Sequence, residues 1–409
     1  MRRGIADCIG VLFAGRDEPV VGHALATIGV APEGEARVLA DRGSASAPDA
    51  AFVNATAAHA LDYDDTGLDG HPSVVLAPAV LAEGEARGAT WAEILAAYAA
   101  GYEVWAELIA RDADKHHGKG WHPTAVFGAV ACAAAGARLR CLDVTQAAHA
   151  LGIAASMAAG LVANFGSMTK PLQVGWAARN GLDAARLAQR GVTASPDVLE
   201  SPRGFLSALS PAGRVRLDGE CRAAAPWQLL KQGLNIKRYP VCYALHRAVD
   251  AALELQPQAA GRIESIERID VSLGRLQAAM LRSSRPETGL DAKFSAEYAL
   301  ACALAHGRLG LADLTDEAVA APKLQALLRR VRVTPIDARD PEEPLFSPAD
   351  TLRVLFRDGT TLDATPVRRA SGHATQPIDN AALRAKFADC GAPPSQCESH
   401  TTTHPALSP

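Results

Sequence analysis

The chain has 409 residues, of which 48% are hydrophobic and only 5% aromatic, and its formal net charge is −4 at pH 7. This length is sufficient for a large core and predicts two or more domains. Charges of both signs are interspersed, which excludes a basic nucleic-acid-binding stripe and an acidic tail for a basic partner. No run of about eighteen uncharged apolar residues occurs, which excludes a membrane-spanning helix.

The N-terminal segment MRRGIADCIGVLFAG loosely resembles a signal peptide, but Asp7 interrupts its apolar run. No small-residue cleavage site follows promptly, so we predict an amphipathic helix. The eight cysteines form no CxxC pair, and most lie within apolar helical patterns. They predict buried, reduced thiols in a cytoplasmic protein rather than disulfides or a zinc site.

The pattern up to about residue 232 is helical throughout and rich in alanine, which favours closely packed helices over a β-sandwich. Glycine, proline and aspartate separate the successive segments. The expected helices span residues 3–15, 49–67, 72–87, 91–111, 123–139, 143–162, 171–190 and 203–209.

From residue 233 the pattern mixes strands and helices. Residues 263–273 alternate like a half-buried strand, and residues 329–336 predict a second one. Residues 351–356 and 360–365 flank Asp358-Gly359, which is the signature of a β-hairpin. Further helices are expected near residues 244–256, 293–307 and 315–329.

The sequence therefore predicts a mainly α protein with an α+β part. A large all-helical domain is expected over residues 1–232 and a smaller α+β domain over residues 233–376. Residues 377–409 are expected to return to the helical domain. They end, from Gly391 onward, in a polar tail without periodicity that we predict to be disordered.

Four short segments combine a cationic or titratable residue with a proline. In the first three the proline follows directly and a helical pattern comes after it, which places the titratable residue just ahead of a helix N-terminus. Free N–H groups and the helix dipole attract anions there. Such ends could converge on a pocket for several carboxylates, or each could be an ordinary solvated helix start. The segments are His71-Pro72-Ser73, His122-Pro123-Thr124, Lys170-Pro171-Leu172 and Lys237-Arg238-Tyr239-Pro240.

Residues 54–71 (NATAAHALDYDDTGLDGH) carry a second polar cluster. On a helix, His59, Asp62 and Thr66 would share one face, and Asp64 and Asp65 would point elsewhere. A buried Asp62 would need a partner, so it could orient an imidazole or titrate itself. The alternative is a solvated helix end formed by Asp64, Asp65 and Asp69.

The sequence motifs give little support for a metal-binding or nucleotide-binding site. Asp64-Asp65 and Asp69 loosely resemble the aspartate-rich magnesium motif of helical prenyl and terpene synthases, but no second carboxylate-rich motif or aromatic lining accompanies them. The spacing of HHGKGWH (116–122) fits no standard zinc pattern and predicts a flexible glycine-rich loop. No phosphate-binding glycine loop or GxSxG motif is present.

Together these segments resemble the MmgE/PrpD family, whose activities include methylcitrate dehydration, cis-aconitate decarboxylation and iminodisuccinate epimerisation. The matching blocks run in family order over most of residues 1–390. They are HALDYDDTG (59–67), HPSVVLAPAVLA (71–82), GYEVWAEL (101–108), GWHPTAVFGAVACAAA (120–135), ALGIAASMAAGL (150–161), GSMTKPLQVGWAARNGLDAARLAQRG (166–191), IKRYPVCYALHRAVDAAL (236–253) and KFSAEYALACAL (293–304).

The resemblance implies a helical domain with an α+β lid, a homodimer, and an active site between the domains that needs no metal, nucleotide or iron–sulfur cofactor. The substrate would be a small di- or tricarboxylic acid. We expect catalytic roles for three residues and substrate-binding roles for five. The expected catalytic residues are Asp62, His71 and His122, and the expected substrate-binding residues are Thr66, Lys170, Lys237, Tyr298 and His246.

Two departures leave the reaction open. Cys242 stands where the decarboxylase branch has a histidine, and the block around residues 61–73 is shorter than in the dehydratase. The first hypothesis is a cofactor-free lyase, either a dehydratase or a decarboxylase. The alternatives are an epimerase or isomerase of a dicarboxylate such as iminodisuccinate, and a catalytically silent polycarboxylate-binding paralogue.

Overall fold

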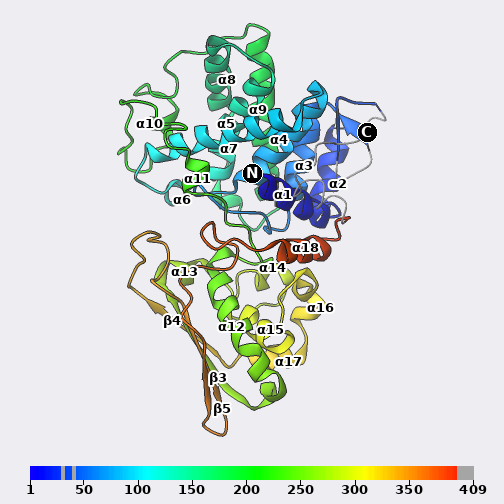
Figure 1. Cartoon of the computed structure of the whole chain (residues 1–409), viewed down its shortest axis with the longest axis vertical. Helices are drawn as coiled ribbons and strands as arrows, with labels where there is room; N and C mark the ends of the chain where they lie inside the picture. Colours follow the sequence, from blue (N-terminus) through cyan, green and yellow to red (C-terminus); the bar gives the residue numbers. More distant parts are fainter. Residues whose placement is uncertain (29–32, 39–42, 394–409) are drawn as a thin grey trace. The chain divides into compact units, whose positions relative to one another are not determined.

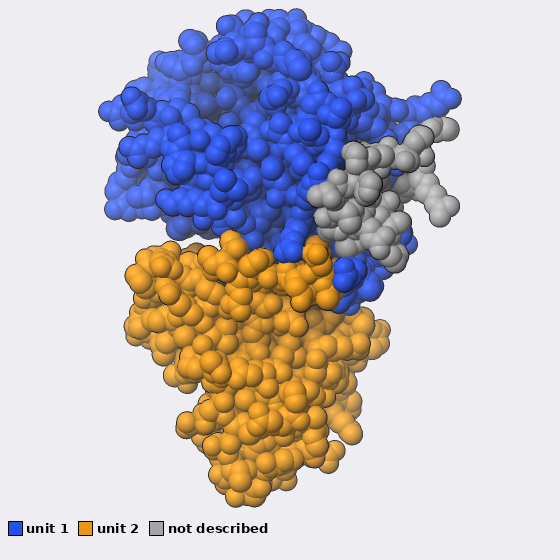
Figure 2. Space-filling view, in the orientation of Figure 1, with its two compact units in different colours: residues 1–236, 384–409 blue, residues 237–383 orange. Residues whose placement is uncertain are grey.

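The computed structural model describes residues 1–28, 33–38 and 43–393, so the predicted disordered tail lies largely outside the described residues. The chain divides into two compact units (Figure 2). Unit 1 comprises residues 1–236 and 384–409, and unit 2 comprises residues 237–383. The sequence had placed these divisions at residues 232/233 and 376/377.

Unit 1 is helical apart from a short two-stranded ladder (Figure 1). The last helix, α18, begins in unit 2, and its residues from Arg384 onward belong to unit 1. The elements are α1 (Arg2–Gly15), α2 (Pro19–Ile28), β1 (Ala36–Arg37), β2 (Ser44–Ala45), α3 (Ala47–His59), α4 (Pro72–Arg87), α5 (Trp91–Ala110), α6 (His116–Lys119), α7 (Pro123–Leu139), α8 (Val144–Met157), η1 (Val162–Asn164), α9 (Thr169–Gln189), α10 (Phe205–Leu209), α11 (Gln228–Lys231) and α18 (Asn380–Asp389).

Helix α7 lies at the centre of unit 1 and packs against α4, α5, α8 and α9. Alanine and glycine allow these backbones to approach closely. A Cβ on Gly181 of α9 would lie 2.6 Å from the carbonyl oxygen of Ala129 on α7. A Cβ on Gly175 would lie 2.5 Å from the carbonyl oxygen of Phe52 on α3. The small residues therefore set how closely α9 sits against its neighbours.

Two of the predicted helix starts are confirmed to the residue. Helix α4 begins at Pro72 with His71 as its N-cap, and α7 begins at Pro123 with His122 as its N-cap. Both caps have non-helical backbone angles, as the following proline requires. Lys170 differs from the prediction, because α9 begins at Thr169 and Lys170 lies within its first turn.

The helix predicted over residues 49–67 is wrong at its C-terminal end. Helix α3 ends at His59, and Asp62, Leu68 and Asp69 have φ of 55°, 50° and 57°. A left-handed residue cannot continue an α-helix, so residues 60–71 form a loop. His59, Asp62 and Thr66 therefore do not share a helical face.

The structure differs from the predicted helix boundaries in several smaller ways. Helix α2 was not predicted, and α8 ends at Met157 rather than at residue 162. The stretch predicted as a flexible loop at residues 116–122 contains the short helix α6. The predicted helix 315–329 is two helices, because Pro322 starts a new one after α16.

Unit 2 is α+β, as predicted. Strand β3 pairs in parallel with β4 and antiparallel with β5, and β6 completes the order β4-β3-β5-β6. The predicted hairpin joins β5 to β6. The elements are η2 (Tyr243–Leu245), α12 (His246–Ala259), η3 (Ala260–Ser265), β3 (Ile266–Gly274), α13 (Arg275–Met280), α14 (Gly289–Ala292), α15 (Ala296–His306), η4 (Leu311–Leu314), α16 (Asp316–Val319), α17 (Pro322–Leu328), β4 (Val331–Ile336), β5 (Thr351–Phe356) and β6 (Thr361–Asp363).

The core of unit 2 lies between this sheet and the helices α12 and α15, which cover one face of it. Alternate residues of β3, including Ile269, Val271 and Leu273, are buried in that core. None of the helices in the described ranges combines the length and apolar composition of a bilayer-spanning segment. The predicted N-terminal helix is present as α1, and most of its residues are buried.

Candidate functional site

Four helix ends of unit 1 bring polar side chains together. His59 ends α3, His71 precedes α4, His122 precedes α7, and Lys170 lies in the first turn of α9. The ring of His59 lies 4.8 Å from that of His71 and 6.0 Å from that of His122, centroid to centroid. The three imidazoles therefore form one cluster, which we call the histidine cluster.

Asp64 connects two of these imidazoles. Its carboxylate lies 3.0 Å from His59 Nδ1 and 2.8 Å from His71 Nδ1. The carbonyl oxygen of Asp65 also lies 2.8 Å from His71 Nδ1. All of these partners accept hydrogen bonds, so both Nδ1 atoms carry a hydrogen. Whenever either ring is neutral, its Nε2 atom therefore keeps its lone pair.

His122 is held in the same tautomer by a different partner. Its Nδ1 lies 2.7 Å from Gln173 Oε1. The amide of Gln173 is oriented because its Nε2 donates to the carbonyl oxygen of Leu161 at 3.1 Å. Oε1 then accepts from His122 Nδ1, which leaves Nε2 of His122 as the bare nitrogen.

Asp62 and Lys170 supply opposite charges beside the cluster. Lys170 Nζ lies 2.7 Å from Asp62 Oδ1, and His71 Nε2 lies 3.8 Å from the same oxygen. Lys170 Nζ also lies 5.0 Å from the ring centroid of Phe165, and that ring packs edge-on against His122 at 4.8 Å. Lys170 is thus linked to His71 through Asp62 and to His122 through Phe165.

Burial determines which of these groups are charged. Burial lowers the pKa of His59 from 6.5 to about 4 and that of His122 to about 2, so both rings are neutral near pH 7. Burial alone would raise the pKa of Asp64, but the neighbouring His59 and His71 hold it well below its usual value. Asp64 is therefore an anion between imidazoles whose tautomers it determines.

Asp65 and Thr66 have distinct surroundings. Burial, reinforced by the nearby Asp7, raises the pKa of Asp65 to about 7, although Ser73 donates hydrogen bonds to its carboxylate. The backbone of Thr66 pairs with Asn235. Its buried hydroxyl has no hydrogen-bond partner among the residues that the structure describes.

The remaining predicted site residues lie in unit 2. Lys237 is 1% exposed. His246 packs between the rings of Tyr239 and Tyr243, at 5.2 and 5.0 Å. The hydroxyl of Tyr298 donates to the carbonyl oxygen of Asp313. A substrate-binding role for these three residues stays a prediction.

Sequence reasoning missed the central role of Asp64 in this geometry. We expected Asp64 and Asp65 either to point away or to form a solvated helix end, but both are fully buried. Phe165 and Gln173 were also missed, because nothing in their local pattern indicates a contact with His122. One feature of the sequence could have indicated the contact of Asp64. Several aspartates follow His59 closely, and any of them that is buried needs a hydrogen-bonding partner such as an imidazole.

The loop also assembles a possible metal-ligand group that residue spacing did not indicate. The donor atoms of His59, Asp62, Asp64 and His71 all lie within 4.8 Å of one another. However, the ammonium group of Lys170 already neutralises Asp62, and Asp64 is engaged by two imidazoles. Lys170 thus already supplies a positive charge beside Asp62.

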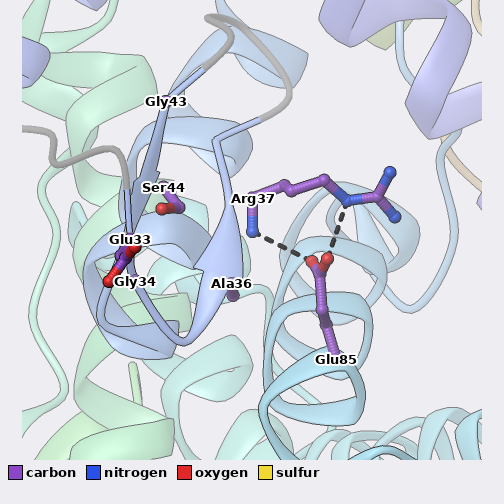
Figure 3. Close-up of a pocket in the computed structure, with 7 residues that line it drawn as sticks. All are labelled: Glu33, Gly34, Ala36, Arg37, Gly43, Ser44 and Glu85. Carbon is purple, nitrogen blue, oxygen red and sulfur yellow. Dashed lines mark hydrogen bonds and ion pairs between the residues drawn. The ribbon is translucent and has the colours of Figure 1, made fainter. Parts of the chain in front are cut away.

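A cavity of unit 1 lies elsewhere, between the β1–β2 ladder and α4 (Figure 3). Two of the residues that line the cavity, Arg37 and Glu85, are hydrogen-bonded to each other. The backbone N–H of Arg37 donates to the Glu85 carboxylate at 2.9 Å, and Arg37 Nε donates to it at 2.7 Å. Its other lining residues include Glu33 and Ser44. It contains no member of the histidine cluster, so we do not assign the chemistry to it.

Comparison with known proteins agrees with the residue-level resemblance. Residues 1–218 match the MmgE/PrpD N-terminal domain, and residues 239–402 match the MmgE/PrpD C-terminal domain. Similar curated proteins are cis-aconitate decarboxylases. The one from Mus musculus is 30% identical over 83% of this chain and 70% of its own length. Those from Homo sapiens and Aspergillus terreus are each 29% identical, over 83% and 88% of this chain and 71% and 78% of their own lengths. The chain belongs to the MmgE/PrpD family.

Proposed function

We propose that this protein is a lyase that removes CO2 or water from a small tricarboxylic acid, with cis-aconitate as the first substrate to test. The family membership and the cis-aconitate decarboxylases among its relatives support this proposal. The single observation that carries it is that the Lys170 ammonium group and His71 Nε2 both lie beside Asp62, within a cluster that also contains the imidazoles of His59 and His122.

Both reactions create the same difficulty. Decarboxylation breaks a carbon–carbon bond, and the electron pair passes onto the remaining carbon skeleton before a proton returns to it. Dehydration removes a proton from the carbon next to a carboxylate and then expels hydroxide. In each reaction negative charge accumulates on a carboxylate, and a fixed cation in a water-poor site stabilises it.

The residues of unit 1 divide this work. Lys170 exchanges Asp62 for a substrate carboxylate and stabilises the developing charge. His71 transfers the proton through Nε2, because Asp64 and the carbonyl oxygen of Asp65 hold its Nδ1 hydrogen in place. Asp62 is placed to receive or return that proton, 3.8 Å from His71 Nε2. The hydroxyl of Thr66, which has no hydrogen-bond partner in the described part of the chain, positions the substrate.

The finer parts of the proposal extend beyond unit 1. We propose that unit 2 acts as a lid that brings Lys237 to the substrate, with Tyr298 and His246 supporting it, and that the protein works as a homodimer. Proton transfer and charge stabilisation by side chains are sufficient for the chemistry, so we propose a reaction without a cofactor. His71, His122 and Lys170 lie together near three helix N-termini, and this supports the proposal that these helix ends bind substrate carboxylates.

A second candidate is epimerisation of a dicarboxylate, and one observation favours keeping it. Cys242 stands where the family resemblance implies a histidine in the decarboxylase branch, and His71 with Asp62 forms a pair of proton-transfer groups that an epimerase also requires. Epimerisation removes a proton next to a carboxylate and returns it to the opposite face. It releases neither CO2 nor water.

The test is incubation of the purified full chain with cis-aconitate, methylcitrate and iminodisuccinate in deuterated water, followed by NMR. Loss of a carboxylate with deuterium on the product indicates decarboxylation, and a new double bond indicates dehydration. Deuterium exchange alone indicates epimerisation. No change in any substrate would refute the lyase proposal and leave a silent carboxylate-binding protein.

Matched lysine variants test the site itself. Lys170→Ala removes the proposed charge-stabilising group, whereas the side chain of Lys323 is 93% exposed and pairs with the exposed Glu264. We expect Lys170→Ala to lose about 1.5–3 kcal/mol of transition-state stabilisation and Lys323→Ala to retain normal turnover. Equal turnover in the two variants would remove Lys170 from the site.

A further inference from the structure

Unit 2 contains a cluster of side chains that the proposed lyase chemistry does not use. Cys302 and His306 lie four residues apart on α15 and therefore on one face of that helix. The chain then turns at Gly307, where φ is 70°, and η4 brings Asp313 against the same face. One ligand atom from each of the three side chains lies within 4.8 Å of the other two.

Two of the three distances between these ligand atoms are close to the edges of a tetrahedral metal site. Cys302 Sγ lies 3.6 Å from His306 Nδ1, and His306 Nδ1 lies 3.1 Å from Asp313 Oδ1. Bonds of about 2.3 Å to sulfur and about 2.0–2.2 Å to nitrogen and oxygen give edges of roughly 3.6 Å and 3.3 Å in tetrahedral geometry. The third pair, Cys302 and Asp313, has its ligand atoms within 4.8 Å.

The carboxylate of Asp313 is already oriented for this purpose. Its Oδ2 accepts from the Gly310 N–H at 3.0 Å and lies 3.5 Å from Arg308 Nε. Its Oδ1 is thereby directed at His306. The main chain is held as well, because the Tyr298 hydroxyl donates to the Asp313 carbonyl oxygen. Such outer contacts are typical of groups that orient metal ligands.

Access to the cluster comes from the side of His306. The side chain of His306 is 41% exposed, whereas Cys302 is fully buried and the Asp313 side chain is 4% exposed. An ion can therefore reach two buried ligands past a solvent-facing imidazole, and water can complete the coordination.

We propose that Cys302, His306 and Asp313 bind a divalent transition metal of the zinc class, with water as the fourth ligand. A thiolate, an imidazole and a carboxylate form a donor set suited to such ions rather than to Mg²⁺ or Ca²⁺. Binding converts the Cys302 thiol into a metal-bound thiolate and releases one proton per ion, so the affinity rises with pH. The ion would tie α15 to η4 and thereby fix the loop that holds Tyr298. This proposal is independent of the proposed lyase function.

The test is titration of the metal-stripped full chain with Co²⁺, which reports its ligands by absorption. A thiolate ligand gives an intense sulfur-to-cobalt band in the near ultraviolet, whereas Co²⁺ at the histidine and aspartate side chains of unit 1 gives none. We expect a band that saturates at one Co²⁺ per chain and disappears when Zn²⁺ is added. Cys302→Ser should abolish the band, and Cys141→Ser, at an exposed cysteine, should retain it.

A second variant protects the test against misfolding. His306→Ala changes an exposed side chain, and we expect it to keep the fold while it weakens Co²⁺ binding by about tenfold or more. Zn²⁺ should raise the thermal unfolding midpoint of the wild type but not of Cys302→Ser. The proposal is overturned if no saturable sulfur band forms, or if the band survives Cys302→Ser. It is equally overturned if His306→Ala binds Co²⁺ as tightly as the wild type.

Discussion

At the scale of single residues, Asp64 is the group on which the proposed proton transfer depends. Asp64→Asn replaces an acceptor of two Nδ1 hydrogens by an amide that also donates, so His71 loses the charged one of its two Nδ1 acceptors and keeps only the carbonyl oxygen of Asp65. We expect turnover to fall by about 10²–10⁴-fold with little change in tricarboxylate binding. The pH–rate profile should shift as well, which a purely structural defect would not produce. Steady-state kinetics and calorimetric titration separate these effects.

Asp69→Asn is the matched control, because Asp69 belongs to the same loop but pairs with the exposed Lys115. It should have nearly normal turnover. If Asp64→Asn were equally active, Asp64 would only fill space beside the imidazoles.

His71→Asn tests the proton carrier itself. Asparagine retains some of the size and hydrogen bonding of histidine but cannot carry a proton near neutral pH. We expect turnover to fall by about 10²–10⁴-fold while an unreactive tricarboxylate still binds. Weakened binding with normal turnover at saturation would instead make His71 a carboxylate-binding residue. The proton-transfer role would then pass to His122 or Asp62.

The site could be predicted from sequence only where its chemistry is local. His71 and His122 were placed correctly, because a following proline constrains the backbone of the residue before it. Asp64 could not be placed, because its position depends on the left-handed turn at Asp62 and on burial against two imidazoles. Those contacts form only when α3, α4 and the intervening loop pack together.

At the scale of elements, the distance between α3 and α9 controls how Lys170 meets the histidine cluster. Gly175→Ala would place a Cβ against Thr56 Oγ1 and 2.5 Å from the Phe52 carbonyl oxygen, so α9 must move away from α3. We expect a loss of about 1–3 kcal/mol in the free energy of unfolding and reduced turnover. Denaturant unfolding and kinetics of the variant measure both.

Gly22→Ala provides the comparison, because a Cβ there meets no atom within 4 Å and Gly22 lies in helix α2. That variant should be as stable as the wild type or more stable by up to about 1 kcal/mol. Equal stability of the two variants would show that α9 has room to shift.

Elements were more predictable at their starts than at their ends. Prolines mark the first residues of α4 and α7, and the Asp358-Gly359 turn marks the β5–β6 hairpin. The end of α3 was missed, because it depends on non-glycine residues that adopt positive φ. The pattern of hydrophobic and polar residues does not indicate which residues adopt a positive φ.

At the scale of the whole molecule, buried histidines should make the stability of the protein depend on pH. Burial lowers the folded-state pKa of His59 and His117 from 6.5 to about 4 and that of His122 to about 2. The unfolded chain therefore binds more protons in this range, and stability should rise with pH from about 4 to 6.5. His59 alone accounts for roughly 3 kcal/mol of that rise.

Asp65 acts in the opposite direction, because its pKa is raised from 3.8 to about 7 and its contribution is lost as pH rises between those values. Burial also raises the pKa of four other carboxyl groups, which act in the same direction as Asp65, and it lowers the pKa of His116, which acts with the other histidines; the four are Asp183, Asp250, Glu297 and Asp350. We expect a net rise, because the downward pKa shifts of His59, His117 and His122 together exceed the upward shift of Asp65. Thermal unfolding midpoints between pH 4.5 and 6.5 measure it, with His59→Gln expected to flatten the curve. A midpoint that falls with pH would contradict the neutral, buried state of these rings.

The return of the chain to unit 1 has a consequence for how the protein is made. Lys386, in α18, is buried with its Nζ 2.5 Å from Asp7 Oδ1 and 2.8 Å from the carbonyl oxygen of Tyr63. A ribosome that has synthesised unit 1 up to Ile236 must still produce all of unit 2 before Lys386 exists. Throughout that interval Asp7 of the nascent unit 1 lacks its contact with Lys386. Completion of unit 1 therefore waits until α18 has been synthesised, and a chaperone that shields α1 would act during that wait.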